Sequence, residues 1–224
     1  MALILHINSA LETASVILSS DDEIIFGAEN NFQKEHASFL EPAIKRVCDA
    51  AQINLGNIDA VSVVNGPGSY TGLRVSLSSA KAFCYALKKP LILLNTLDVM
   101  ACALKLQSSV KQENILFCPF IDARRMEVFT ALYDYELNIV RNYSAETIDE
   151  DFLNKESEVG TIIAGGNGSL KLQKLTQRKN FTYINPLFLS KPSVILGNKA
   201  WVDQKFSDIV YSEPFYLKQV YFKK

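Results

Sequence analysis

The stretch Val61-Ser-Val-Val-Asn-Gly-Pro-Gly-Ser-Tyr-Thr-Gly-Leu-Arg74 decides the fold class of this 224-residue chain. An apolar run of strand length leads directly into a glycine-rich turn, and a helical pattern then continues to about Lys88. A strand, a glycine turn and a helix N-terminus in direct succession are typical of α/β proteins, where such turns often bind phosphate. We therefore expect an α/β fold.

The glycine loop within this stretch is a candidate nucleotide or phosphate site. Gly66, Gly68 and Gly72 would let a phosphate approach the backbone, and Ser69 or Thr71 would cap the helix. No Lys-Ser/Thr pair follows, as a P-loop requires, and the spacing differs by one residue from the dinucleotide-binding fingerprint. A tight structural turn explains the same residues equally well, so both interpretations stay open.

A second glycine loop, Ile163-Ala-Gly-Gly-Asn-Gly-Ser169, also lies between a buried strand pattern and a short helical pattern. Gly165, Gly166 and Gly168 are its candidate phosphate-binding residues. One loop in each half of the chain predicts a nucleotide held at both ends between two lobes. The alternative is an ordinary turn with Asn167 in a left-handed conformation and the final serine as a helix cap.

Both halves of the chain follow the same order, a strand meander and then helices alternating with strands. We predict an N-terminal lobe over residues 1–106, completed by the tail 208–224, and a C-terminal lobe over residues 107–207. The predicted strands are Leu3–Ile7, Ala14–Leu18, Glu23–Ala28, Ala60–Val64, Leu91–Leu94, Ile115–Ile121, Glu127–Tyr133, Leu137–Val140, Thr161–Ala164 and Phe181–Ile184. The predicted helices are Ala37–Ala51, Thr71–Lys88, Asp98–Leu106, Leu170–Leu175 and Val194–Phe206.

The predicted helix Thr71–Lys88 has two stripes of different character. Its large apolar side chains share one stripe and predict packing on the sheet. Small side chains form a second stripe of Val75, Ser79, Ala82 and Ala86. This second stripe either packs against a neighbouring helix of the same chain or forms a docking surface for another protein.

Composition excludes several functional classes. The chain has 23 Lys and Arg against 24 Asp and Glu, so it has no overall basic field that would attract nucleic acid. Its two histidines, His6 and His36, stand far apart, which argues against a metal site. The four cysteines form no C-x-x-C pair, and neither a signal peptide nor a membrane span is recognisable. We expect a cytoplasmic protein that does not associate with membranes.

Five motifs together resemble the TsaB (also called YeaZ) family. They are Gly66-Pro-Gly-Ser-Tyr-Thr-Gly-Leu-Arg74, His36-Ala-Ser-Phe-Leu-Glu-Pro42, Asp122-Ala-Arg-Arg125, Gly166-Asn-Gly168 and Tyr216-Leu-Lys218. The first is highly specific, and together they cover nearly the whole chain. The resemblance implies an actin-like ATPase fold of two duplicated lobes, each with a mixed sheet and flanking helices, as in sugar kinases and heat-shock chaperones.

The resemblance also implies a role without chemistry of its own. Members act as scaffold or activator subunits of the complex that installs threonylcarbamoyl on adenosine beside the anticodon of tRNA. They pair with the catalytic paralogue TsaD, support recruitment of TsaE, and reach tRNA only through the complex. In the absence of TsaD we expect a homodimer. No cofactor is required, although weak ATP or ADP binding at the glycine loops is compatible with the fold.

Two departures from the family pattern bear on nucleotide chemistry. The first turn reads Asn8-Ser9-Ala10, where relatives have an acidic residue that suits a metal–phosphate. Met126 stands where many relatives have glycine. Both differences argue against independent ATP hydrolysis.

The helices Ala37–Ala51 and Thr71–Lys88 are the expected contact with TsaD. The residues predicted to form it are Leu40, Ile44, Val75, Ser79, Ala82, Phe83 and Ala86. The alternative function is a free-standing actin-like ATPase or small-molecule kinase. A dinucleotide-binding protein and a peptidase are weaker rivals, the latter because no nucleophile–base pair can be assembled.

Overall fold

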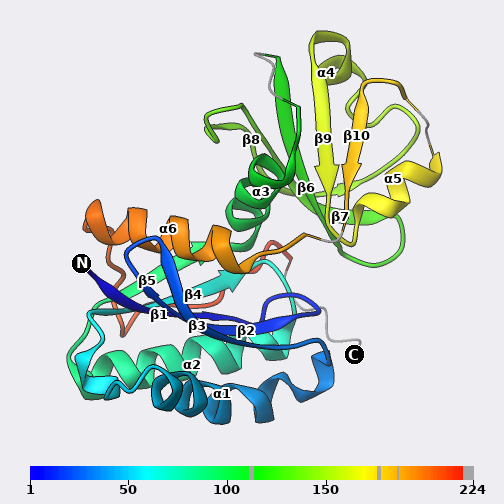
Figure 1. Ribbon diagram of the computed structural model, residues 1–224. Coiled ribbons are helices and arrows are strands. Elements are labelled where there is room, and N and C mark those ends of the chain that lie inside the picture. The colour runs from blue at the N-terminus through cyan, green and yellow to red at the C-terminus, as the bar shows by residue number, and fades with distance from the viewer. Residues whose placement is uncertain (111–113, 176–177, 186, 219–224) are drawn as a thin grey trace, which may run out of the picture. The chain divides into compact units, whose positions relative to one another are not determined.

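The computed structural model describes residues 1–110, 114–175, 178–185 and 187–218, and the chain forms two units (Figure 1). Unit 1 consists of Met1–Thr96 with Ser190–Phe215, and unit 2 consists of Leu97–Leu189 with the end of the chain from Tyr216. Each unit has one five-stranded mixed sheet, in the orders β3-β2-β1-β4-β5 and β8-β7-β6-β9-β10. In both, an antiparallel meander is extended by two parallel strands, which confirms the predicted duplication.

The elements lie close to the predicted ranges. Unit 1 contains β1 Leu3–Asn8, β2 Ala14–Ser20, β3 Glu23–Asn30, β4 Ala60–Gly66, β5 Leu91–Asn95, α1 His36–Ala50, α2 Tyr70–Leu87 and α6 Ser190–Val202, with short 3-10 helices at Gln33–Glu35 and Leu55–Asn57. Unit 2 contains α3 Thr96–Gln107, β6 Ile115–Asp122, β7 Glu127–Tyr133, β8 Ile139–Thr147, α4 Asn154–Val159, β9 Thr161–Gly165, α5 Ser169–Leu175 and β10 Phe181–Ile184.

The two faces of the unit 1 sheet differ in chemistry. Because side chains alternate along β1, Leu5 and Ile7 face α1 and α2 and join the main apolar core, while His6 faces α6. Figure 1 shows α1 and α2 beneath the sheet and α6 above it. On the α6 side His6 and Ser62 are buried, and burial lowers the pKa of His6 to about 3. The face under α1 and α2 is therefore apolar, whereas the face under α6 mixes buried polar side chains with apolar ones such as Ile17 and Ile92, which pair in register with His6 and Ser62.

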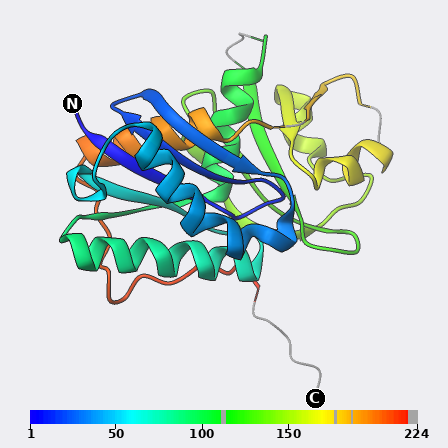
Figure 2. The same cartoon turned by 60° about the horizontal axis from the view of Figure 1, so that its bottom comes forward.

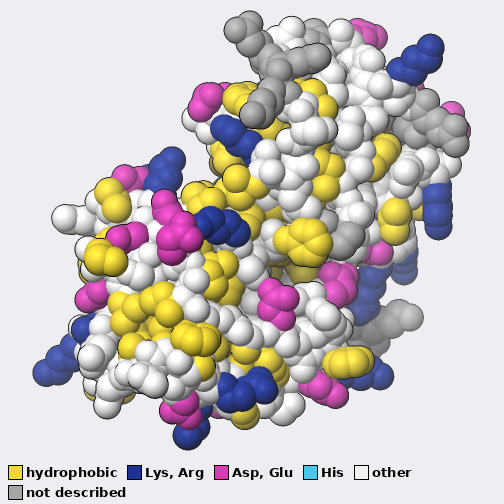
Figure 3. Space-filling model, in the orientation of Figure 1, with side chains coloured by type: hydrophobic (Ala, Val, Ile, Leu, Met, Phe, Trp, Pro, Cys, Tyr) yellow, Lys and Arg dark blue, Asp and Glu magenta, His cyan; other side chains and the backbone are white. Residues whose placement is uncertain are grey.

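The edge strand β3 exposes three consecutive apolar side chains, Ile24, Ile25 and Phe26. Figure 3 shows hydrophobic side chains gathered over this part of unit 1. Glu23 and Glu29 flank them, and such charges on an edge strand discourage pairing with other chains.

In unit 2, α3 is tied to the sheet through a half-buried carboxylate. Asp98 accepts hydrogen bonds from the hydroxyls of Tyr133 (2.7 Å) and Tyr143 (2.8 Å). Burial raises the pKa of Asp98, although both hydrogen bonds oppose this rise, and burial beside Asp98 raises the pKa of Tyr133. A separate apolar core, which includes Phe120 and Ile162, joins α4 and α5 to the sheet.

The contacts divide the chain differently from the predicted lobes 1–106 and 107–207. Helix α3 belongs with unit 2 because Asp98 bonds to its strands, and α6 belongs with unit 1 because Gly197 packs on His6. The tail from residue 208 to Phe215 lies with unit 1, as predicted, and residues 219–224 lie outside the described part of the chain. The hydrophobic pattern of a helix does not indicate which distant sheet the helix packs on, so these two assignments could not be predicted from the sequence.

Two elements were predicted with wrong bounds. Strand β8 continues to Thr147, well beyond the predicted Leu137–Val140, because it is a largely exposed edge strand without a clear apolar alternation. Helix α6 starts at Ser190 rather than near residue 194, since Pro192 fits the first turn of a helix. Among the described residues, no helix is long and apolar enough to cross a membrane.

Candidate functional site

The first glycine loop is closed against the turn between β1 and β2. The Ser69 amide donates to the Ala10 carbonyl (2.7 Å), and the Ser9 hydroxyl donates to the Gly72 carbonyl (2.8 Å). A side chain at Gly68 would collide with the Ala10 carbonyl, and one at Gly72 would collide with the Ser9 carbonyl. These glycines are therefore required for close packing of the backbone onto the turn.

Gly66 has a different role in the same loop. Its φ of +127° is a conformation that side-chain-bearing residues rarely adopt, and a Cβ there would collide with the Phe215 carbonyl. The tail segment thus closes the loop from the other side. Of the two predicted helix caps, Ser69 is the one that acts, because its hydroxyl accepts from the Gly72 amide (3.3 Å), while Thr71 is exposed in the first turn.

The second glycine loop also packs on backbone. A Cβ at Gly165 would meet the Ile184 carbonyl, and one at Gly168 would meet the backbone of Ile121. The left-handed residue is Gly166, with φ of +95°, which corrects the prediction of Asn167 in that conformation. The loop glycines therefore serve strand and helix packing in both units.

Beside this loop, Lys171 on α5 binds the turn between β6 and β7. Its ammonium lies 2.5 Å from an Asp122 carboxylate oxygen and donates to the Glu127 carbonyl (2.8 Å). Burial raises the pKa of Asp122, but the hydrogen bond from Lys171 and a second one from the Arg124 amide outweigh it, so the pKa lies below its usual value. The sequence analysis singled out Asp122-Ala-Arg-Arg125 only as a motif and missed Lys171, which is distant in the chain.

Within the described ranges, no three His, Cys, Asp or Glu side chains lie together so that they could hold a metal ion.

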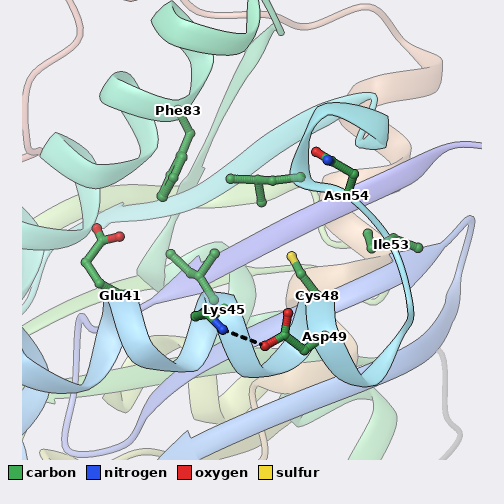
Figure 4. A pocket seen from close by; sticks show the side chains of 9 residues that line it. Glu41, Lys45, Cys48, Asp49, Ile53, Asn54 and Phe83 are labelled. Atoms are coloured by element: carbon green, nitrogen blue, oxygen red, sulfur yellow. Dashed lines mark hydrogen bonds and ion pairs between the residues drawn. The ribbon is translucent and has the colours of Figure 1, made fainter.

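A groove opens between α1, α2 and the segment that follows α1 (Figure 4). Its volume is about 350 Å³. The apolar lining comes from Ile44, Cys48, Ile53, Leu55 and Phe83, and the polar lining from Glu41, Lys45, Asp49 and Asn54. A hollow with apolar walls and charged residues around it suits the side chains of a partner protein.

The residues predicted at a partner interface fall into three groups. Leu40 is fully buried in the core, which corrects its assignment to a partner interface. Ile44 also belongs to the core, but it lines the bottom of the groove. Helix α1 has five more buried side chains at helical spacing beside these two, so the whole stripe faces the core. A surface stripe cannot be distinguished from such a core stripe by periodicity alone.

The α2 candidates remain closer to the surface. Val75 packs partly against the core, and the Ser79 hydroxyl donates to the Glu41 carboxylate of α1 (2.8 Å). This half of the small stripe therefore packs within the chain. Ala82 and Ala86 are exposed, and Phe83 is half-buried in the groove wall. The groove residues after α1, such as Ile53 and Leu55, were not predicted, and only their apolar character in a loop could have indicated them.

The fold places the chain in a known class of protein. Two units that repeat one sheet topology are the arrangement of actin-like, two-lobed α/β proteins. A candidate N-acetylmannosamine kinase of Listeria monocytogenes shares the fold at a TM-score of 0.52 and 9% identity, over 91% of this chain and 99% of that one.

Sequence comparison then gives the family. The family model described as TsaD, tRNA N6-adenosine threonylcarbamoyltransferase, matches residues 30–220, and the chain belongs to this family. The tRNA threonylcarbamoyladenosine biosynthesis protein TsaB of Bacillus subtilis is 26% identical over 176 residues, which are 77% of this chain and 74% of that protein. YeaZ from Pseudomonas aeruginosa has the same fold, with a TM-score of 0.81 and 20% identity over 97% of this chain and all of the other. The predicted resemblance to TsaB is confirmed.

Proposed function

We propose that this protein takes part in the biosynthesis of threonylcarbamoyladenosine in tRNA as a non-catalytic subunit that pairs with a TsaD-type transferase. The role in biosynthesis is supported by the TsaB relative from Bacillus subtilis and by the family match. The observation that carries the pairing is the α1–α2 surface, which combines the groove with the exposed Ala82 and Ala86. Small side chains let the backbone of a partner helix approach closely, and Phe83 offers an apolar contact beside them.

The proposal requires no cofactor. Each candidate glycine of the two loops packs against a neighbouring backbone segment, which supports a structural reason for its presence. ATP or ADP binding would then be a weak, secondary property, measurable by calorimetric titration. Recruitment of a TsaE-type protein would follow from the pair and not from this chain alone. Without the partner, the same surface would form a homodimer.

The test places a charge at the centre of the surface. Ala82→Glu should weaken binding of the TsaD-type protein of the same organism at least about tenfold in a calorimetric titration, because the carboxylate would lose water without gaining a partner. The homodimer should become a monomer in light scattering. Ala50→Glu, an equally exposed site at the end of α1, is the matched control and should bind normally. Full affinity of Ala82→Glu would overturn the assignment of the surface.

The biosynthetic role is tested separately. Depletion of this protein in its host should lower threonylcarbamoyladenosine in tRNA, and re-expression of the wild type, but not of Ala82→Glu, should restore it. An unchanged level after depletion would contradict the proposed function as a whole.

A further inference from the structure

Helix α2 has a second flank, which is distinct from the groove and is rich in basic and aromatic residues. Tyr70, Arg74, Lys81, Tyr85 and Lys88 recur at helical spacing and share one side of the helix. Phe83 lies on the other side, in the wall of the groove, and Ala82 lies between the two sides, one helical turn before Tyr85. From residue 70 to residue 90 the chain has four cations and no carboxylate, although the whole protein has a net charge of −1. The flank is therefore a local basic stripe on a nearly neutral protein.

A segment of the tail, residues 203–215, borders this flank and is called the strap below. Figure 2 shows it running along α2 on the side away from α1. The Lys81 ammonium fixes it by donating to the carbonyls of Val210 (3.2 Å) and Ser212 (3.0 Å). Tyr211 stands between these two residues on the strap, and Tyr85 follows Lys81 by one helical turn; the side chains of Tyr211 and Tyr85 are 83% and 82% exposed.

A hollow lies where the end of α2 meets the strap. It has a volume of about 650 Å³, and its lining consists of Cys84, Tyr85, Ala86, Lys88, Lys89, Pro90 and Ile209, so at Ala86 it adjoins the α1–α2 surface. Two lysines beside an exposed tyrosine can neutralise phosphates while the ring stacks on a base. At the other end of the stripe, the Arg74 guanidinium lies over the Tyr70 ring, 4.1 Å from its centre, and is exposed.

We propose that this flank of α2 binds the phosphate backbone and unpaired bases of RNA, with Arg74, Lys88 and Lys89 on phosphates and Tyr85 and Tyr211 on bases. The strap brings three carboxylates, Asp203, Asp208 and Glu213, and one cation, Lys205. Asp203 pairs with Lys205 (3.1 Å), and Asp208 accepts from the amides of Val210 and Tyr211. Flank and strap together therefore hold five cations against three carboxylates, so the surface stays basic. The choice of RNA as the polyanion rests on the proposed function. This proposal gives the chain a direct contact with RNA, whereas the family resemblance implies that tRNA is reached only through the complex.

The test measures binding of a fluorescent RNA hairpin with a loop of about seven nucleotides to the purified full-length chain. Changing Arg74, Lys88 and Lys89 together to glutamine should raise the Kd about tenfold or more at about 50 mM salt. It should also flatten the slope of log K against log salt by about 2, because each lost phosphate contact contributes about 0.7 on single strands. Tyr85→Ala should raise the Kd by about tenfold without changing that slope.

The matched control changes three exposed lysines elsewhere, Lys34, Lys155 and Lys199, to glutamine, which alters the net charge equally. Its Kd and salt slope should match the wild type. Equal weakening by both triple variants, or no binding by the wild type at low salt, would overturn the proposal. Polyglutamate that competes as well as RNA, together with an unaffected Tyr85→Ala, would show an acidic protein as the partner and would also overturn it. Arg74, Lys88 and Lys89 do not line the α1–α2 groove, so failure of the triple variant leaves the Ala82→Glu result intact. Tyr85 lies one turn from Ala82, so Tyr85→Ala is also titrated with the TsaD-type protein and should bind it normally.

Discussion

Replacing Gly72 by alanine should destabilise the protein, although alanine is the better helix former. The new Cβ would overlap the carbonyl of Ser9, a backbone atom that cannot rotate away. Overpacking of this kind costs about 1–3 kcal/mol. Displacing Ser9 also disturbs the hydrogen bond from its hydroxyl to the Gly72 carbonyl, at a further cost of about 1 kcal/mol. The helix preference of alanine returns at most about 1 kcal/mol.

The net loss in the free energy of unfolding is therefore about 2 kcal/mol, which corresponds to a Tm lower by about 4–8 °C at this chain length. Urea unfolding followed by the fluorescence of Trp201 measures it, because this single tryptophan belongs to unit 1. Gly27→Ala is the control, since its Cβ would lie at an ordinary 3.6 Å from Ile17. It should change stability by less than about 0.5 kcal/mol.

A Gly72→Ala protein as stable as the wild type would refute this reasoning. If the variant also lost ATP binding that the wild type shows, the glycine would be kept for a ligand and not for the Ser9 contact.

Three further outcomes are expected. Burial lowers the pKa of His6 to about 3, so as the pH drops the unfolded chain binds a proton before the folded protein does. The free energy of unfolding should therefore fall by up to about 1.4 kcal/mol per pH unit below about pH 6.5. In urea unfolding at several pH values, His6→Gln should flatten this dependence, and an unchanged slope would contradict it. Tyr133→Phe removes one of the two hydroxyls that donate to the half-buried Asp98 carboxylate, and it should lower the free energy of unfolding by about 1.5–3 kcal/mol. In the Tyr133→Phe protein, Asp98→Asn should cost less stability than it does in the wild type, and an equal cost would contradict the coupling. Lys171→Met should raise the pKa of Asp122 toward its usual value, which a carbon-detected NMR titration reports, and an unmoved pKa would show that the ammonium is not its main partner.

The elements that were predicted well are those whose apolar periodicity and end signals lie within a few residues of one another in the sequence. Strands β7 and β10 have the predicted bounds, and α2 differs from its prediction by one residue at each end. Their periodicity and the glycines and prolines that flank them are local features, which suffice to predict the type and the ends of an element. The glycine loops were located correctly for the same reason.

The sequence could not show whether an apolar or small side chain of a helix faces the core of the chain or its surface. Leu40 shares the periodicity of a docking stripe and lies in the core, while Ala82 lies on the surface. The glycine loops show the same limit, because a close approach to the Ser9 carbonyl and a close approach to a phosphate require the same residue. Lys171 and Asp122 are brought together only by the pairing of β6 with β9, over a long separation in sequence.

Helix α6 lies late in the sequence, and this position affects the order in which the two units can fold during synthesis. This helix covers the His6 side of the first sheet, yet it is encoded after the whole of Leu97–Leu189. At about 5–20 residues per second, a ribosome needs on the order of 5–20 s to add that intervening stretch. During this time β1 and β4 have emerged without their cover, while the later unit can already close its own core. The nascent chain should thus complete its second half before its first, and a chaperone would meet the uncovered sheet in that interval.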